Sequence, residues 1–189
     1  MTSVAILLGT FDGARFLPDQ LRSFGHQTFA TWRLFASDDG STDATVAILS
    51  HFLEKLGPSK VQIRKGPCCG FVANFLSLAC DQTITSDYFA YSDQDDICEP
   101  EKLLRAIDLL QTIPPETHAM FCSRTRLIDE EGRECGYSSL CRRKPSFRNA
   151  LVQSIAGGHS VVFNEATRRL LVAGASRVQV PSQIGGPIS

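Results

Sequence analysis

The sequence of 189 residues lacks long apolar runs and a strong charge of either sign. No apolar stretch approaches the roughly 18 residues that a membrane-spanning helix needs. The first apolar run, Val4 to Leu8, is too short for a signal-peptide core and follows no basic leader, so we expect a cytoplasmic protein. The formal net charge is −1, and this balance gives no general electrostatic reason to expect nucleic acid as a partner.

Several motifs that would define other classes of protein are also missing. The seven cysteines are odd in number and contain no C-x-x-C spacing, which argues against a disulfide framework and against a zinc site. No G-x-G-x-x-G follows the first apolar run and no G-x-x-x-x-G-K-[ST] occurs, so a dinucleotide fold and a P-loop kinase are disfavoured. There is no G-x-S-x-G for an acyl-transfer serine.

The first 112 residues show alternating strand and helix patterns. Short apolar runs predict strands at Val4–Leu8, Trp32–Ala36, Val61–Arg64 and Tyr88–Ser92. Apolar residues at helical spacing predict helices over Leu17–Phe24, Val46–Leu56 and Phe71–Ala79, and from Glu99-Pro100 onward. This alternation predicts an α/β fold with a mostly parallel sheet flanked by helices.

After Pro114-Pro115 the pattern becomes weaker. We expect strands at Ala119–Ser123, Arg126–Ile128 and Ser160–Phe163, a helix over Glu165–Val172, and irregular structure over residues 133–146. The length and the 43% hydrophobic content suit one compact domain with a sizeable core. Within it we distinguish residues 1–112 from residues 113–189.

Polar or acidic turns follow three of the expected strands. They contain Thr10 and Asp12, Asp38 and Asp39, and Asp93, Asp95 and Asp96. Ligands of open parallel sheets bind beyond the carboxyl ends of the strands. We therefore expect these three turns to converge on one edge of the sheet and to form a binding site there.

The acidic cluster Asp93-Gln94-Asp95-Asp96 has the D-x-D spacing of a divalent-cation site. Mg²⁺ and Mn²⁺ prefer hard oxygen ligands and are often shared with substrate phosphates. The alternative is that Asp96 caps the helix that begins near Pro100. The Asp38-Asp39 pair also has two interpretations, a hydrogen-bond acceptor for a base or ribose, or a turn that leads into a helix capped by Ser41 or Thr42.

Three stretches together resemble glycosyltransferase family 2, the inverting enzymes with the Rossmann-like GT-A fold. They are Val4 to Gly13, Ser37 to Asp43 and Ser92 to Ile97, supported by Asn74-Phe75-Leu76 after Gly70. The Asp-Gln-Asp-Asp form is most similar to rhamnosyltransferase-like members. The resemblance covers roughly residues 3 to 172.

The resemblance implies the following roles, which are expectations here. The nucleotide-sugar pocket would be lined by Thr10, Asp12, Asp38, Asp39, Asn74, Asp93 and Gln94. Asp93 would face the ribose or sugar, Asp95 would bind Mg²⁺ or Mn²⁺, and Asp96 would assist. The donor would be a UDP- or dTDP-linked sugar, and the acceptor a saccharide or a lipid-linked molecule at the inner face of the membrane.

The sequence also departs from the family pattern. Phe11-Asp12 stands where Tyr-Asn is usual, and Cys98 where a Trp is common. No Asp or Glu follows Glu165, whereas family members carry their catalytic base in a later acidic motif. We therefore expect a C-terminally truncated chain with an incomplete acceptor-side half and no catalytic base. A nucleotide-sugar-binding module without transfer activity remains an alternative, and a response-regulator-like domain is a more distant one.

Overall fold

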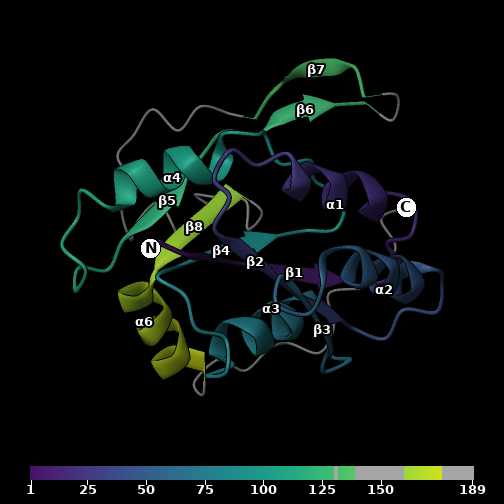
Figure 1. Cartoon of the computed structure of the whole chain (residues 1–189), viewed down its shortest axis with the longest axis horizontal. Helices are drawn as coiled ribbons and strands as arrows, with labels where there is room; N and C mark the ends of the chain where they lie inside the picture. Colours follow the sequence, from purple (N-terminus) through teal and green to yellow (C-terminus); the bar gives the residue numbers. More distant parts are fainter. Residues whose placement is uncertain (130–131, 139–159, 176–189) are drawn as a thin grey trace, which may run out of the picture.

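The computed structural model describes residues 1–129, 132–138 and 160–175. Its centre is a six-stranded sheet with the strand order β3-β2-β1-β4-β8-β5 (Figure 1). The strands are β1 (Val4–Thr10), β2 (Trp32–Asp38), β3 (Val61–Lys65), β4 (Tyr88–Ser92), β5 (Met120–Cys122) and β8 (Val161–Asn164). Strands β1 to β4 are parallel, and β8 runs antiparallel to both of its neighbours. The expected mostly parallel α/β sheet is confirmed.

Helices cover both faces of the sheet, with α1 and α4 on one side and α3 and α6 on the other (Figure 1). The helices are α1 (Leu17–Gly25), α2 (Thr45–Leu56), α3 (Phe71–Cys80), α4 (Lys102–Leu110) and α6 (Glu165–Ala175). All seven residues of β1 are buried. Val4, Ile6 and Leu8 pack into the core under α1, α2 and α4, while Ala5 and Leu7 pack into the core that contains residues of α3. A strand buried on both faces explains its uninterrupted apolar run.

The second part of the chain contributes to the same sheet. Strand β8 pairs with β4 on one side and with β5 on the other. A separate two-stranded sheet consists of β6 (Arg126–Ile128) and β7 (Glu134–Tyr137). The expectation of irregular structure over residues 133–146 is wrong for β7, which is exposed and contains Gly136 at φ 134°. An exposed strand with an internal glycine has no apolar alternation by which it could be recognised. Residues 139–146 lie outside the described residues.

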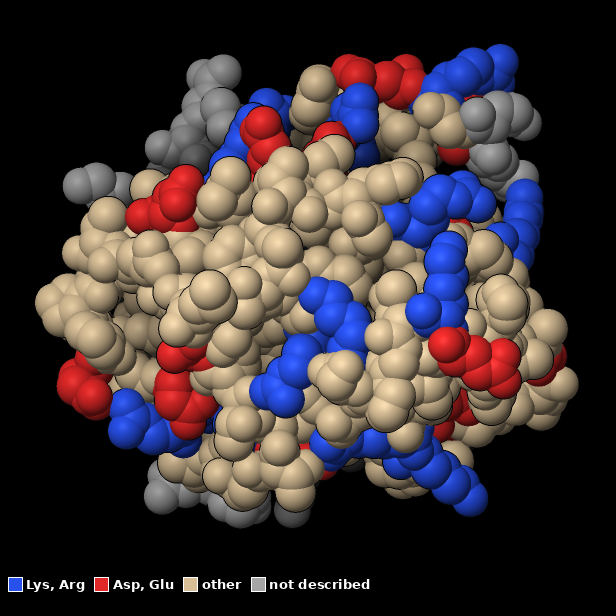
Figure 2. Space-filling view, in the orientation of Figure 1, with Lys and Arg blue, Asp and Glu red and all other residues tan. Residues whose placement is uncertain are grey.

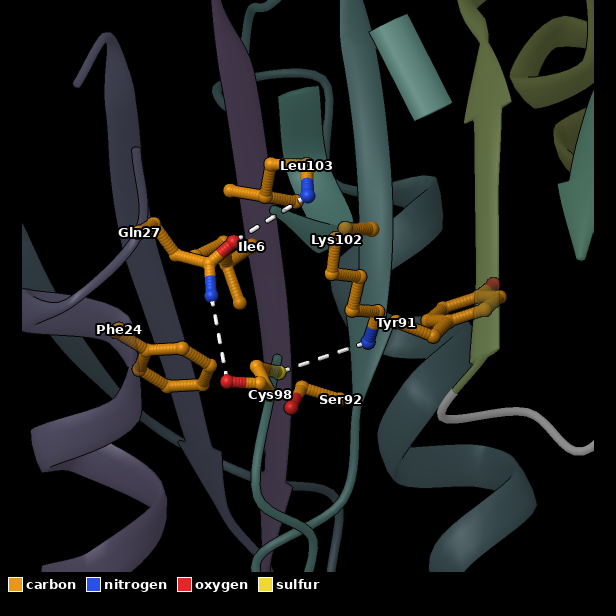
Figure 3. A pocket seen from close by; sticks show the side chains of 9 residues that line it. Ile6, Phe24, Gln27, Tyr91, Ser92, Cys98, Lys102 and Leu103 are labelled. Atoms are coloured by element: carbon orange, nitrogen blue, oxygen red, sulfur yellow. Dashed lines mark hydrogen bonds between the residues drawn. The ribbon is translucent and has the colours of Figure 1, made fainter. Parts of the chain in front are cut away.

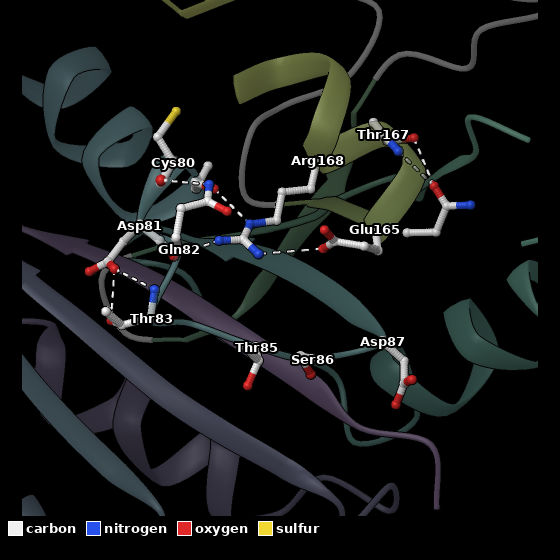
Figure 4. Close-up of polar contacts among 12 residues, drawn as sticks. Cys80, Asp81, Gln82, Thr83, Thr85, Ser86, Asp87, Glu165, Thr167 and Arg168 are labelled. Carbon is white, nitrogen blue, oxygen red and sulfur yellow. Dashed lines mark hydrogen bonds and ion pairs between the residues drawn. The ribbon is translucent and has the colours of Figure 1, made fainter. Parts of the chain in front are cut away.

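Arg168 of α6 ties the C-terminal end of α3 to the rest of the fold (Figure 4). Its side chain is buried; Nε donates to the carbonyl oxygen of Ala79 at 2.8 Å and Nη2 to that of Asp81 at 2.5 Å. The guanidinium lies 4.6 Å from the centre of the Phe89 ring. The last carbonyls of a helix have no partner within the helix, so this arginine supplies one from another element. In the described ranges, no helix has the length and apolarity needed to cross a bilayer.

Candidate functional site at the carboxyl edge of the sheet

The ends of β1, β2 and β4 are neighbours at one edge of the sheet. Thr10 at the end of β1 is in register with Asp38 at the end of β2, and Leu8 is in register with Ser92 at the end of β4. The three polar turns that the sequence singles out therefore leave the sheet side by side. The convergence expected from the sequence is present in the structure.

Asp38 joins the end of β2 to β1 and organises the turn that follows. Its Oδ1 accepts a hydrogen bond from the Thr10 hydroxyl at 3.0 Å, and its Oδ2 accepts from the amides of Gly40 and Ser41 at 3.2 and 3.0 Å. The side chain is buried. Gly40 has φ 98°, a conformation that glycine adopts without strain. Asp38 thus fixes the shape of this part of the site from within.

Asp39 holds the loop between β3 and α3. Each of its carboxylate oxygens accepts one backbone amide, from Cys68 at 2.7 Å and from Gly70 at 2.8 Å. The Asp39 amide in turn donates to the Thr10 carbonyl at 2.8 Å. The buried carboxylate therefore places the loop that precedes α3 next to the end of β1.

The side chain of Asn74, in α3, contacts the same edge of the sheet at the end of β2. Its Nδ2 donates to the Ser37 carbonyl at 2.9 Å, while its buried Oδ1 accepts no hydrogen bond from the described residues. Gly66 packs directly against this oxygen, since a methyl group at Gly66 would lie 2.7 Å from it and 2.9 Å from the Asp38 carbonyl. A larger residue at position 66 would push the loop away from β2.

Asp12 connects the turn after β1 with the turn before α2. Its Oδ1 accepts the amides of Thr42 at 2.7 Å and Asp43 at 3.3 Å, and its own backbone has φ 44°. Asp43 joins the same two turns in the opposite direction. Its carboxylate accepts hydrogen bonds from the amides of Ala14 and Thr45, both at 2.9 Å. A hydrogen bond from the Thr45 hydroxyl is the main reason that the pKa of Asp43 lies below its usual value.

The expected capping of this helix by Ser41 or Thr42 is wrong. Helix α2 begins at Thr45, and Ala44 precedes it without a side-chain cap. The amide of Thr42 is instead bonded to Asp12 from another loop. Asp43 satisfies the Thr45 amide in the first turn of the helix. The expected local cap is absent because the contact between Asp12 and the Thr42 amide, which joins two loops, holds the chain before the helix in another conformation.

Gln94 joins the turn after β4 to the turn after β1. Its Oε1 accepts the Phe11 amide and its Nε2 donates to the Phe11 carbonyl, both at 2.8 Å. This amide-to-backbone pair occupies both polar ends of the side chain. Gly13 makes it possible, because a side chain at Gly13 would overlap the Gln94 amide. In the structure Gln94 therefore connects two loops of the site, and the expected contact with a nucleotide sugar stays a prediction.

The three carboxylates of the acidic cluster have different surroundings. Asp93 is half-buried and its Oδ1 accepts the Gln94 amide at 3.0 Å, whereas Asp95 is exposed and Asp96 is half-buried. Among residues 1–129, 132–138 and 160–175, no group of three or more His, Cys, Asp or Glu side chains is placed to hold a metal ion. A cation bound here would thus need ligands other than three protein carboxylates.

Asp95 and Asp96 line a groove of about 850 Å³. Its other walls come from the start of α4 and from β5, β6 and β7, and include Phe121 and Tyr137. Arg126 of β6 forms an ion pair with Glu99 of the β4–α4 segment, so the small sheet is tied to that segment. On the face seen in Figure 2, charged side chains of both signs are scattered around a large uncharged area.

Three polar residues that support this site were not singled out by sequence reasoning. Gln20 and Ser23 of α1, and Gln27 in the turn that follows it, are buried facing the β4–α4 segment. A recognisable signal was present for Gln20 and Ser23, because they lie three residues apart within the predicted helix Leu17–Phe24, whereas Gln27 lies beyond its end. Buried polar side chains on such a face need hydrogen-bond partners in another element.

Known proteins resemble this chain in both sequence and fold. The family model described as Glycosyl transferase family 2 matches residues 6–171. The dTDP-rhamnosyl transferase RfbG of Shigella flexneri is 35% identical over 106 residues, which are 54% of this chain and 36% of that protein. The putative glycosyltransferase EpsE of Bacillus subtilis is 26% identical over 108 residues, 57% of this chain and 38% of that protein. The matches thus span little more than a third of these relatives.

Solved structures show the same fold at low sequence identity. The mannosyltransferase PcManGT of Pyrobaculum calidifontis, in complex with GDP-Man and Mn²⁺, has a TM-score of 0.62 at 15% identity and matches 96% of this chain and 48% of its own. Residues 1–349 of TarS of S. aureus have a TM-score of 0.58 at 14% identity and match 98% of this chain and 52% of their own. These neighbours have the GT-A fold. By its sequence over residues 6–171 and by this fold, the chain belongs to glycosyl transferase family 2.

Proposed function

We propose that this protein transfers a sugar from a nucleotide-diphosphate sugar to a saccharide or lipid-linked acceptor, with inversion and with help from Mg²⁺ or Mn²⁺. The observation that carries the proposal is the convergence of three polar turns at the ends of β1, β2 and β4, beside a groove of about 850 Å³. Ligands of parallel sheets bind at such an edge. The membership in glycosyl transferase family 2 agrees with this chemistry.

The nucleotide end of the donor would lie against Asp38, Asp39 and Thr10. Each Asp39 oxygen accepts one backbone amide, and a carboxylate has about four acceptor positions in all. Asp39 can therefore accept a further hydrogen bond from a base N–H or a ribose hydroxyl without losing the loop that it holds. Asp12 and Asn74 would complete this end of the pocket. Because both loops are fixed by internal hydrogen bonds, the pocket is formed before the donor arrives.

The diphosphate would lie at Asp95 and Asp96, with Asp93 toward the ribose or sugar. The donor set fits Mg²⁺ or Mn²⁺, because these ions take hard oxygen ligands and are often held by one or two carboxylates plus substrate phosphates and water. Phosphate and water oxygens would have to complete the coordination, because the described residues contain no three-carboxylate cluster. The mannosyltransferase with the same fold was solved with GDP-Man and Mn²⁺. A bound cation would neutralise the charge of the departing nucleoside diphosphate.

The donor sugar and acceptor would meet in the groove between the β4–α4 segment and the small sheet. Inversion requires one displacement at the anomeric carbon, in which the acceptor hydroxyl loses its proton to a base as the diphosphate leaves. We assign this base to no residue of the chain. A UDP- or dTDP-linked donor and a lipid-linked acceptor follow from the family resemblance as parts of the same proposal, in which the protein works at the inner face of the membrane.

A second candidate is a module that binds nucleotide sugars without transferring them. The observation that favours it is the lack of any Asp or Glu among residues 166–189, where the family pattern has its base. Both candidates predict binding of nucleoside diphosphate that depends on a divalent cation. Mass spectrometry of saccharide and lipid-linked acceptors after incubation with UDP- and dTDP-sugars separates them. A transferred sugar excludes the binding module.

Calorimetric titration with UDP and with dTDP tests what the two candidates share. We expect Mn²⁺ to strengthen the binding of at least one nucleotide about tenfold or more, and Asp95→Ala to remove that gain. Asp108→Ala is the matched control, because Asp108 is an exposed aspartate on α4 outside the residues that line the groove. Binding of neither nucleotide, or binding indifferent to Mn²⁺ and to Asp95→Ala, would contradict the proposed function.

A further inference from the structure

Buried polar side chains on α1 and in the turn after it face the segment that carries Asp95 and Asp96. Gln20 is fully buried, and Ser23 and Gln27 are 4% and 8% exposed. They lie among the apolar residues of the core between the sheet and the helices. Placing polar groups there is costly unless each is hydrogen-bonded. Their partners therefore show what these side chains are for.

Gln27 makes the most extensive of these contacts (Figure 3). Its Nε2 donates to the Glu99 carbonyl at 2.8 Å and lies 3.5 Å from the Cys98 carbonyl. Its Oε1 accepts the amide of Leu103 at 3.2 Å. That amide belongs to the first turn of α4, where backbone N–H groups have no partner within the helix. One side chain thus caps α4 and holds the residues that lead into it.

Two polar residues of α1, Ser23 and Gln20, extend the same attachment toward β4. The Ser23 hydroxyl accepts the Cys98 amide at 3.1 Å, and Gln20 donates to the hydroxyl of Ser92. Beyond Gln27, the Thr28 amide donates to the Pro100 carbonyl at 2.9 Å. Side-chain and main-chain hydrogen bonds therefore attach the chain to α1 and to the turn after it on both sides of Asp95 and Asp96.

These attachments matter because residues 93–101 belong to neither β4 nor α4. A segment without helix or sheet hydrogen bonds has to satisfy its buried backbone groups through side chains or water. Apolar residues at positions 23 and 27 would remove the hydrogen-bond partners of the Cys98 and Leu103 amides. The position of the two carboxylates would then no longer be fixed by the scaffold.

We propose that Gln27 is a positioning residue that fixes Cys98 to Leu103 against the turn after α1, and so holds Asp95 and Asp96 in the geometry that binds a divalent cation and a diphosphate. This inference rests on the proposed function. Gln27 itself touches neither ligand. It acts as the outer partners of a metal site do, by orienting the residues that bind.

Gln27→Met tests this role, because methionine keeps the unbranched length of glutamine and removes its hydrogen bonds. We expect the gain in UDP or dTDP affinity caused by Mn²⁺ to fall about tenfold, while the affinity without metal stays unchanged. In the metal-free protein, hydrogen exchange at the amides of Cys98 and Leu103 should become faster. Gln111→Met is the control, since the Gln111 amide bonds the Thr2 hydroxyl at 2.9 Å at the other end of α4. It should change none of these quantities.

A double-mutant cycle separates positioning from loss of stability. With Asp95 already replaced by alanine, Gln27→Met should weaken nucleotide binding no further. An unchanged Mn²⁺ gain in Gln27→Met, or an equal loss with and without Mn²⁺, would overturn the positioning role. If Gln27→Met does not fold, Gln27→Glu keeps the acceptor for Leu103 and removes the donor to Glu99, and the same outcomes apply. Metal-independent binding by the unmodified chain contradicts the proposed function itself, so the two failures are distinguishable.

Discussion

At the scale of single residues, the site depends on close approaches between its loops. Gly13 packs against the Gln94 amide, which joins the turns after β1 and β4 through its pair of hydrogen bonds with Phe11. Gly66 packs against Asn74 and the Asp38 backbone in the same way. These glycines are required by their neighbours and not by turn geometry, which is why the sequence alone does not distinguish them from other glycines.

Gly13→Ala should displace Gln94 from Phe11. We expect the free energy of unfolding in urea to fall by about 1–2 kcal/mol, the usual net contribution of two hydrogen bonds, and the Mn²⁺-dependent nucleotide affinity to weaken. Gly25→Ala is the control, because a methyl group there meets no atom within 4 Å. It should leave stability unchanged or slightly raised. Equal effects of the two substitutions would show that Gly13 is not needed for the loop contact.

Tyr91 should make stability sensitive to alkaline pH. Burial raises the pKa of Tyr91 to about 12 from the ordinary value of 10.0, and the ring packs against Phe75 and Phe163. Because the folded state holds this proton more tightly, the stabilisation is complete below pH 10 and is lost as pH rises toward 12. Tyr91→Phe should flatten the pH dependence of unfolding in this range. An unaltered dependence would contradict the assignment, and absorbance titration checks the pKa directly.

At the scale of elements, the attachment of α6 to α3 depends on one buried charge. Arg168→Met removes two hydrogen bonds to the carbonyls of Ala79 and Asp81, and should lower the free energy of unfolding by about 2 kcal/mol. Arg169→Met is the matched control, because its ion pair with Glu116 is exposed and should contribute less than about 1 kcal/mol. Thermal or urea unfolding measures both, and comparable losses would refute the special role of Arg168.

The elements that the sequence predicts well are those whose burial pattern is local. Strand β1 is buried on both faces and reads as a continuous apolar run, and the apolar spacing of α4 defines its inward face. Strand β7 is exposed and interrupted by Gly136, so it has no such pattern. The expected cap of α2 by Ser41 or Thr42 is wrong because Asp12, from a loop 30 residues away, takes the Thr42 amide. The missing cap of α2 thus depends on a contact between residues that are distant in sequence.

The same distinction applies to the candidate site. Its acidic turns could be located from the sequence because strand ends in a parallel sheet share an edge. The attachments made by Gln20, Ser23, Gln27 and Gln94 could not, because each joins segments that are distant in sequence. The expected nucleotide contact of Gln94 came from its place within an acidic motif. The structure shows that its polar atoms are bonded to Phe11.

At the scale of the whole molecule, the two parts of the chain share one sheet. Strand β4, which leads to the acidic cluster, pairs with β1 on one side and with β8 on the other. Strand β8 comes from the second part of the chain and also pairs with β5. The groove beside Asp95 and Asp96 is closed by β5 and the small sheet. The carboxyl edge of the sheet and the groove are therefore adjacent, as the proposed transfer between two bound substrates would require.

The position of Mn²⁺ in the presence of UDP or dTDP tests this arrangement most directly. Mn²⁺ broadens the nuclear magnetic resonance signals of nearby amides, and the effect falls steeply with distance. We predict strong broadening at Asp95, Asp96 and Thr10, and little at Val4, which lies at the opposite end of β1, about 20 Å away. Asp95→Ala should abolish the selective effect. Broadening centred near Val4, or uniform over the chain, would contradict a cation and diphosphate site at the carboxyl edge of the sheet.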